Sequence, residues 1–201
     1  MRLAILLSGR GSNFAAIEQA IAERRLDATI VAVISNKATA AGIVHARLRG
    51  LPAHVVEHRL FPTREEHERG VRDILDASSP DLIVLAGYMR LLSPPFIAAF
   101  RNRIVNIHPS LLPSFPGVDA QAQAIEHGVK VSGCTVHFVD EHLDAGPIIV
   151  QRTVEVLDTD DAATLSARIL HEEHAAYVDA LQLLSSRRYV IEGRRVIFES
   201  P

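Results

Sequence analysis

Two polar side chains at the end of an apolar run have the types and the spacing for acid–base chemistry. Asn106 and His108 follow Ile104-Val105, which predicts a buried strand, and Pro109 ends that strand because proline lacks the N–H donor. Residues two apart in a strand share a face, so we expect the amide and the imidazole side by side. Such a pair can stabilise an oxyanion and protonate a leaving nitrogen. The alternative is a histidine that merely marks a strand end.

A carboxylate further along the chain is a candidate partner for this histidine. Asp144 lies in the polar loop Asp140 to Gly146, which separates two extended segments. Read alone, Asp144 is a turn residue, because aspartate before a small residue favours turns. It becomes a catalytic candidate if the loop folds beside the strand end, where its carboxylate would orient His108.

A glycine-rich loop near the N-terminus is a candidate anion site. Gly9 to Phe14 joins a strand to a helix, so its backbone N–H groups can hold an anion. A dinucleotide fingerprint needs a third glycine and an acidic residue after the second strand, but that strand ends near Asn36. NAD is therefore disfavoured. A single phosphate on Gly11, Ser12 and Asn13 and a plain turn capped by Ser12 or Asn13 fit the loop equally well.

The remaining composition excludes several classes of protein. Cys134 is the single cysteine, so the chain has no internal disulfide and no thiolate metal cluster. The helix around His171 and His174 lacks the i, i+4 histidine pair of zinc proteases. The net charge of -3 predicts neither a nucleic-acid nor an anionic-membrane partner. We therefore expect a cytoplasmic protein without a metal.

Strands and helices alternate in the first half of the chain. Continuous apolar runs predict buried parallel strands at Leu3–Leu7, Thr29–Ile34, Ala53–Val56 and Leu82–Ala86, before the strand that carries Asn106. Helical spacing predicts helices at Phe14–Arg24, Ala40–Leu48 and Arg64–Ala77, with Thr63 as a cap, and a short one from Pro94. This rhythm is typical of a doubly wound α/β sheet.

The second half has a different character. A short helix is expected at Asp119–His127, extended strands at Val131–Val139 and Ile148–Val156, a long helix at Asp160–Ser186 and a hairpin around Gly193. Thr159 or Asp160 is the expected cap of the long helix. We predict one domain over residues 1–201, with an N-terminal half, 1–108, that contains the candidate anion loop, and a C-terminal half, 109–201. Its sheet should be mostly parallel, flanked by helices, with an antiparallel C-terminal part.

Taken together, the motifs resemble those of phosphoribosylglycinamide formyltransferases. The matching stretches are Gly9–Asn13, Ser35–Lys37, Leu85–Pro94, Asn106–Pro113, Pro116-Gly117, Val136–Val139 and Leu143–Ile148. The resemblance implies transfer of a formyl group from 10-formyltetrahydrofolate to the glycine amine of glycinamide ribonucleotide in purine synthesis. It implies a Rossmann-like fold, folate as co-substrate without a metal, and a monomer or homodimer.

The resemblance also implies roles for individual residues. Asn106, His108 and Asp144 would be catalytic. Gly11, Ser12 and Asn13 would bind the nucleotide phosphate, and Glu173 would help to hold the ribose side. Arg64 would face the glutamate end of the folate. The pterin would enter a cleft lined by Asn106 and by Met89, Arg90, Leu91, Leu92, Asp140, Glu141, His142, Leu143 and Asp144.

One departure and three rival functions accompany this resemblance. Asp119 stands where family members commonly carry histidine or asparagine, so the resemblance implies no polar contact from this position to the nucleotide or the oxyanion, while the three catalytic candidates are unaffected. A formyltetrahydrofolate hydrolase shares the central motif, but resembles this core with an extra N-terminal domain, whereas the first strand here begins at Leu3. A methionyl-tRNA formyltransferase would need a further C-terminal domain and a basic surface. A non-catalytic folate- or nucleotide-binding module would have no use for the three catalytic candidates together.

Overall fold

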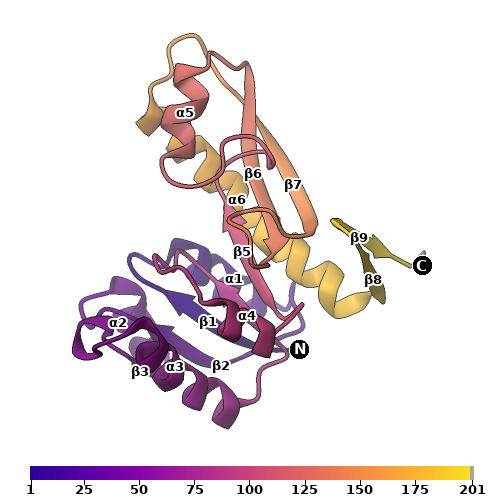
Figure 1. Ribbon diagram of the computed structural model, residues 1–201. Coiled ribbons are helices and arrows are strands. Elements are labelled where there is room, and N and C mark those ends of the chain that lie inside the picture. Colours follow the sequence, from indigo (N-terminus) through magenta and orange to yellow (C-terminus); the bar gives the residue numbers. More distant parts are fainter. Residues whose placement is uncertain (200–201) are drawn as a thin grey trace. The chain divides into compact units, whose positions relative to one another are not determined.

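The computed structural model describes residues 1–199 and divides into two compact units. These are Met1–Val105 and Asn106–Pro201 (Figure 1). The boundary falls inside strand β5 (Ile104–His108), so Asn106 and His108 both belong to the second unit.

The first unit is built on a parallel sheet. Its strands are β1 (Arg2–Leu7), β2 (Thr29–Ser35), β3 (Ala53–Val55) and β4 (Leu82–Leu85), in the order β3-β2-β1-β4. Each neighbouring pair in this order is parallel. Residues Leu3 to Leu7 of β1 are fully buried, as expected for a central strand that is covered on both faces.

Helices connect these strands. They are α1 (Ser12–Ala22), α2 (Ala41–Leu48), α3 (Arg64–Ser78) and α4 (Pro94–Ala99), with a 3-10 turn η1 (His58–Leu60) that the sequence did not predict. Thr63 caps α3, as predicted, because its hydroxyl accepts a hydrogen bond from Glu66 N at 3.2 Å. Two prolines occupy the first turn of α4, where the missing N–H groups would have no intrahelical acceptor.

The second unit continues from β5 with an antiparallel pair and a long helix. Its further elements are α5 (Ala120–Glu126), β6 (Val131–Phe138), β7 (Ile148–Glu155), α6 (Ala162–Ser186), β8 (Tyr189–Glu192) and β9 (Arg195–Phe198). Strands β6 and β7 are antiparallel, β9 pairs in parallel with β7, and β8 and β9 form the predicted hairpin. Helix α6 packs along β6 and β7 (Figure 1).

The cap of α6 differs from the prediction. The helix is capped by Asp161, whose side chain accepts from Thr164 N at 2.8 Å while Thr164 Oγ1 accepts from Asp161 N at 2.9 Å. The predicted Asp160 instead accepts a hydrogen bond from Leu157 N and pairs with Arg168. The prediction of Thr159 as the cap is also wrong, because the reciprocal capping box forms between Asp161 and Thr164.

The fold class is the one that the sequence predicts. The sheet is mostly parallel and flanked by helices, and its C-terminal strands are antiparallel. Within residues 1–199, no helix combines the length and the apolar character that a membrane span requires. The same part of the chain contains no group of three or more His, Cys, Asp or Glu side chains placed to hold a metal ion.

Candidate active site

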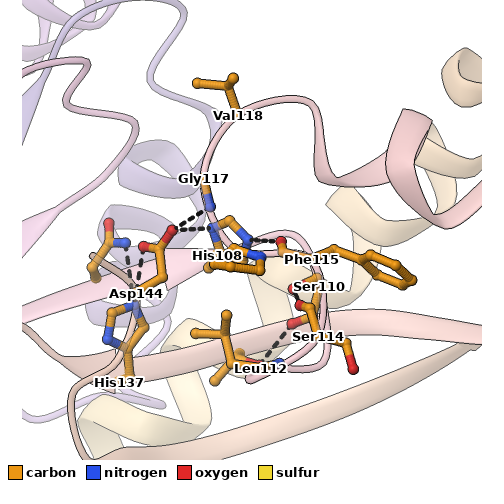
Figure 2. A network of polar contacts seen from close by, with 12 residues as sticks. His108, Ser110, Leu112, Ser114, Phe115, Gly117, Val118, His137 and Asp144 are labelled. Carbon is orange, nitrogen blue, oxygen red and sulfur yellow. Dashed lines mark hydrogen bonds and ion pairs between the residues drawn. The ribbon is translucent and has the colours of Figure 1, made fainter. Parts of the chain in front are cut away.

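The imidazole of His108 is buried between two oxygen acceptors. Its side chain is 6% exposed and its Nδ1 lies 3.4 Å from Asp144 Oδ2. Its Nε2 lies 2.8 Å from the carbonyl oxygen of Phe115 (Figure 2). A carbonyl can only accept, so Nε2 carries a hydrogen in this arrangement. The doubly protonated ring could donate to both oxygens at once.

A tightly constrained loop places the carboxylate of Asp144 beside His108. Asp144 has φ 50°, a left-handed conformation that aspartate tolerates better than most residues. Its Oδ2 also accepts a hydrogen bond from Gly117 N at 2.8 Å, which ties the loop to the segment after Pro116. Two residues on, a Cβ at Gly146 would lie 1.8 Å from Phe138 O, so only glycine fits there. The backbone of β6 therefore determines where the loop lies.

Asn106 is held by a second histidine. Its Nδ2 lies 3.3 Å from His137 Nε2, while His137 Nδ1 lies 2.9 Å from Phe138 O. The hydrogen of His137 is therefore on Nδ1, and Nε2 accepts from Asn106. Burial lowers the pKa of His137, although the bond to Phe138 and the charge of Asp144 act in the opposite direction. A neutral His137 thus fixes one N–H of the Asn106 amide.

Asn106 and His108 are connected to one carboxylate. His108 contacts Asp144 directly, and His137 Nε2, which holds Asn106, lies 3.9 Å from Asp144 Oδ1. All four residues lie in the second unit, on β5, on β6 and in the loop between β6 and β7. The arrangement offers an amide donor and an imidazole proton donor at one strand end, which is the equipment for acyl transfer through an oxyanion.

Thr135 supports the backbone that follows Pro109. This fully buried residue donates its hydroxyl hydrogen to Ser110 O at 2.7 Å and accepts from Leu112 N at 3.0 Å. Gln151 donates to both Leu112 O and Thr135 Oγ1, at 2.9 and 3.0 Å. These bonds satisfy buried backbone groups of a segment without regular structure, and they hold it in one conformation.

The glycine-rich loop lies in the first unit and packs closely on α2. Gly11 has φ 76°, and a Cβ on it would lie 2.9 Å from the Cα of Gly42. Gly11 is itself the cap residue of α1, and no side chain makes a capping hydrogen bond there. The prediction that Ser12 or Asn13 caps this turn is therefore wrong, because the cap position is occupied by Gly11. The N-terminal N–H groups of α1 keep the polarity that favours an anion.

The other predicted substrate contacts are distributed over both units. In the first unit, Arg64 opens α3 with a side chain that is 40% exposed and 3.7 Å from Glu65. Met89 and Leu91 follow β4 and are exposed, at 73% and 68%. The adjoining predicted residues are Arg90 and Leu92.

The second unit holds the remaining predicted contacts. Asp140 accepts a hydrogen bond from His142 N at 2.9 Å, which shapes the loop that also contains Glu141 and the exposed Leu143. Glu173 lies on α6 and is only 8% exposed. Asp119 precedes α5 with φ 55° and makes no side-chain cap.

Three contacts of the catalytic candidates, one each for Asn106, His108 and Asp144, were not predicted from the residues. His137 had one signal, a polar residue inside the apolar run Val136 to Phe138, but its hydrogen bond to Asn106 was not foreseen. The partners at Phe115 and Gly117 are backbone groups, which leave no trace in residue type. Cys134, read as a structural thiol, is fully buried, and burial raises its pKa to about 12.

Comparison with known proteins identifies the family. The family model described as "Formyl transferase" matches residues 1–181. The chain belongs to the formyl transferase family. Its resemblance to phosphoribosylglycinamide formyltransferases is also confirmed, because the enzyme of that name from Escherichia coli is 42% identical over 88% of this chain and 84% of the relative.

Other members of the formyl transferase family show how the match extends. The trifunctional purine biosynthetic protein adenosine-3 of Homo sapiens is 47% identical over 92% of this chain, and the chain spans only 18% of that relative's length. The crystal structure of glycinamide ribonucleotide transformylase 1 from Symbiobacterium toebii has a TM-score of 0.96 at 48% identity. The match covers 100% of this chain and 94% of the Symbiobacterium chain.

The rival hydrolase is a more distant neighbour. A formyltetrahydrofolate deformylase from Pseudomonas syringae has a TM-score of 0.92 but only 28% identity, and the match covers 66% of its chain. The fold is therefore common to both activities, while sequence similarity is greater to the transferases.

Proposed function

We propose that this protein transfers the formyl group of 10-formyltetrahydrofolate to the glycine amine of glycinamide ribonucleotide. The observation that carries the proposal is the cluster of Asn106, His108 and Asp144 in a chain of the formyl transferase family. The names of the E. coli relative and of the Symbiobacterium structure support this choice of acceptor. The proposal includes a cytoplasmic location, a monomer or homodimer, and no metal, nucleic-acid or membrane partner.

In the proposed mechanism the amine attacks the formyl carbon, and negative charge develops on the formyl oxygen. The Nδ2 atom of Asn106 carries two N–H groups, and one of them points to His137. We assign the other to the oxyanion. His108 Nε2 donates to the neutral carbonyl of Phe115, and a charged oxyanion is a stronger acceptor that can replace it.

Proton movement completes the transfer. The attacking amine loses a proton, and the departing folate nitrogen gains one as its bond to the formyl carbon breaks. His108, oriented by Asp144, is the group that we assign to this proton transfer. No covalent intermediate with the enzyme is required, because holding both substrates in place supplies much of the rate enhancement.

The substrate contacts follow the family resemblance. We assign the nucleotide phosphate to Gly11, Ser12 and Asn13, and the ribose side to Glu173. We assign the folate glutamate to Arg64, whose guanidinium suits a carboxylate. The pterin is assigned to two separate segments, Met89–Leu92 in the first unit and Asp140–Asp144 in the second.

A transfer assay with purified protein tests the proposal. The protein is incubated with 10-formyltetrahydrofolate with and without glycinamide ribonucleotide, and formylated nucleotide and free tetrahydrofolate are quantified. We expect both products in equal amounts, and only when the nucleotide is present. Release of tetrahydrofolate at the same rate without the nucleotide would refute the transferase and favour the hydrolase.

A further inference from the structure

The segment between β4 and α4 is an exposed apolar strip with buried polar anchors at its two ends. Met89 and Leu91 extend from it with 73% and 68% of their surfaces exposed. The segment belongs to no helix or strand, so its own backbone does not determine its shape. Hydrogen bonds hold the segment at Gly87 and Met89 at one end and at Ser93 at the other.

Ser8 anchors the first end. Its backbone N donates to Gly87 O at 3.0 Å, and its hydroxyl accepts from Met89 N at 2.8 Å. The same hydroxyl donates its one hydrogen to Asn36 Oδ1 at 2.6 Å. Ser8 and Asn36 are 4% and 2% exposed, so water competes little for these bonds. Because the hydrogen is committed to Asn36, the lone pairs of Ser8 face Met89 N.

Glu68 of α3 anchors the second end. Its Oε1 accepts from Ser93 N at 2.7 Å, and its Oε2 accepts from the Ser93 hydroxyl. Ser93 is in turn the cap of α4, where its Oγ accepts from Phe96 N. Glu68 is 7% exposed and Ser93 3%. Burying a carboxylate is unfavourable unless donors compensate it, and Ser93 supplies two.

These anchors leave little freedom for the three residues between Met89 and Ser93. An unanchored strip of this kind would have to be ordered on binding a ligand, and the conformational entropy lost at that moment would weaken binding. A strip that is already ordered binds more tightly, because this entropy has been lost during folding. The anchors would therefore raise the affinity for a ligand that contacts Met89 and Leu91. They would do so through the strip, without contacting the reacting atoms themselves.

We propose that Ser8 and Glu68 are positioning residues that hold Met89–Leu92 in the conformation that binds the folate. The inference rests on the proposed function, because it takes the folate as the ligand of this strip. The inference adds Ser8 and Glu68 to the residues proposed for folate binding, and both act through hydrogen bonds at the ends of the strip. Ser8 also lies next to the glycine-rich loop, so the residue that precedes the phosphate site shapes part of the folate site.

The decisive variant is Glu68→Gln. Glutamine keeps one acceptor oxygen for Ser93 N, but its N–H₂ group cannot accept the hydrogen of the Ser93 hydroxyl and can only donate to Ser93 Oγ. Two bonds to a charged carboxylate are therefore replaced by weaker bonds to a neutral amide. We expect the KM for 10-formyltetrahydrofolate to rise by about tenfold, while kcat changes by less than about twofold. The KM for the nucleotide should stay near that of the wild type. Ser8→Ala, which removes the acceptor for Met89 N, should weaken folate binding similarly.

Asp73→Asn is the matched control for Glu68→Gln. Asp73 lies on the same helix but is exposed. The substitution makes the same change from carboxylate to amide, but at a position that does not anchor the strip. Ser185→Ala, on an exposed position of α6, is the control for Ser8→Ala. Both controls should bind folate like the wild type.

Two measurements that do not depend on turnover accompany the kinetics. Calorimetric titration with 5-formyltetrahydrofolate, a stable folate, should show about tenfold weaker binding by Glu68→Gln and Ser8→Ala. Amide hydrogen exchange of the ligand-free protein should show faster exchange of Ser93 N–H in Glu68→Gln and of Met89 N–H in Ser8→Ala. Slower exchange of the Ser93 N–H in Glu68→Asp than in Glu68→Gln would support the role of the carboxylate at position 68 as the acceptor for Ser93.

The outcomes separate the two proposals. Wild-type folate affinity in both variants, with the wild type active, would overturn the positioning role and leave the proposed function standing. Equal rises in the KM of both substrates with a lower unfolding temperature would also overturn it, because that pattern indicates a general loss of structure. A wild-type protein that binds no folate would overturn both proposals.

Discussion

At the residue scale, the environment of the catalytic candidates assigns a different task to each histidine. His108 lies with both ring nitrogens near oxygens, one of them the carboxylate of Asp144. His137 donates to a backbone carbonyl and accepts from Asn106, and burial lowers its pKa. The first histidine is therefore equipped to carry a proton, and the second to stay neutral and orient an amide.

Removing the imidazole or the charge beside it should reduce turnover strongly. We expect His108→Ala and Asp144→Asn each to lower kcat by roughly 10²–10⁴-fold, the range for acid–base groups. In Asp144→Asn the amide oxygen could still accept from Gly117 N, so the loop should keep its shape while the charge next to His108 is lost. Steady-state kinetics and circular dichroism would measure activity and folding.

Asp158→Asn is a suitable comparison, because Asp158 is exposed and pairs only with Lys130 among the contacts observed for it. This variant should retain full activity. Near-normal kcat in His108→Ala or Asp144→Asn would remove that residue from the proposed mechanism.

At the element scale, the loop between β6 and β7 depends on one close backbone approach. Gly146 lies against Phe138 O, and Phe138 N donates to Pro147 O at 2.9 Å. The end of β6 thus closes the loop that carries Asp144. The loop on the other side, after Pro116, is joined to it by the bond from Gly117 N to Asp144.

Gly146→Ala should therefore damage activity through the backbone. The new Cβ would overlap Phe138 O, and the loop must move to admit it. We expect a loss of about 1–3 kcal/mol in the free energy of unfolding, the usual effect of overpacking, together with a large fall in kcat. Urea unfolding and the transfer assay would measure the two effects.

Gly128→Asn provides the comparison. Gly128 has φ 64° with open space around it, and asparagine tolerates this conformation. This variant should lose little stability and no activity. Equal behaviour of the two variants would contradict a special role for the approach of Gly146 to β6.

At the scale of the whole molecule, buried histidines should make stability depend on pH. Burial lowers the pKa of His67, His137 and His174 below the ordinary value. His67 donates from Nε2 to Val56 O at 3.0 Å, a bond that opposes this shift. The first of these residues lies in the first unit and the other two lie in the second, so both cores contribute.

The sign of the effect follows from proton uptake. Below the ordinary histidine pKa of about 6.5, the unfolded chain takes up protons that the folded chain takes up only at lower pH. The free energy of unfolding should therefore fall as the pH drops from about 7.5 to about 5.5. Urea unfolding across this range would measure it.

His67→Gln tests the origin of this pH dependence. Its amide can still donate to Val56 O but does not titrate, so the decline in stability towards acid should be shallower than in the wild type. An identical decline in both proteins would show that His67 does not contribute. Constant wild-type stability across the range would contradict the prediction for all three histidines.

Much of the fold could be predicted because its signals are local. The run Leu3 to Leu7 predicted a buried strand, and Thr63 predicted the start of α3, since both depend on residue type at short range. The errors arose where neighbours compete. Asp161 caps α6 because Asp160 is engaged by Leu157 N and Arg168, and this competition is settled only in the folded chain.

The sequence by itself determined the alternation of strands and helices, the placement of Asn106 and His108 two apart on one strand, and membership of the formyl transferase family. Only the tertiary structure decided that Asp144 reaches His108 and that His137 holds Asn106. The physical reason is that these partners are distant in sequence. They meet because strands pair in register and because a glycine lets one loop approach a backbone carbonyl.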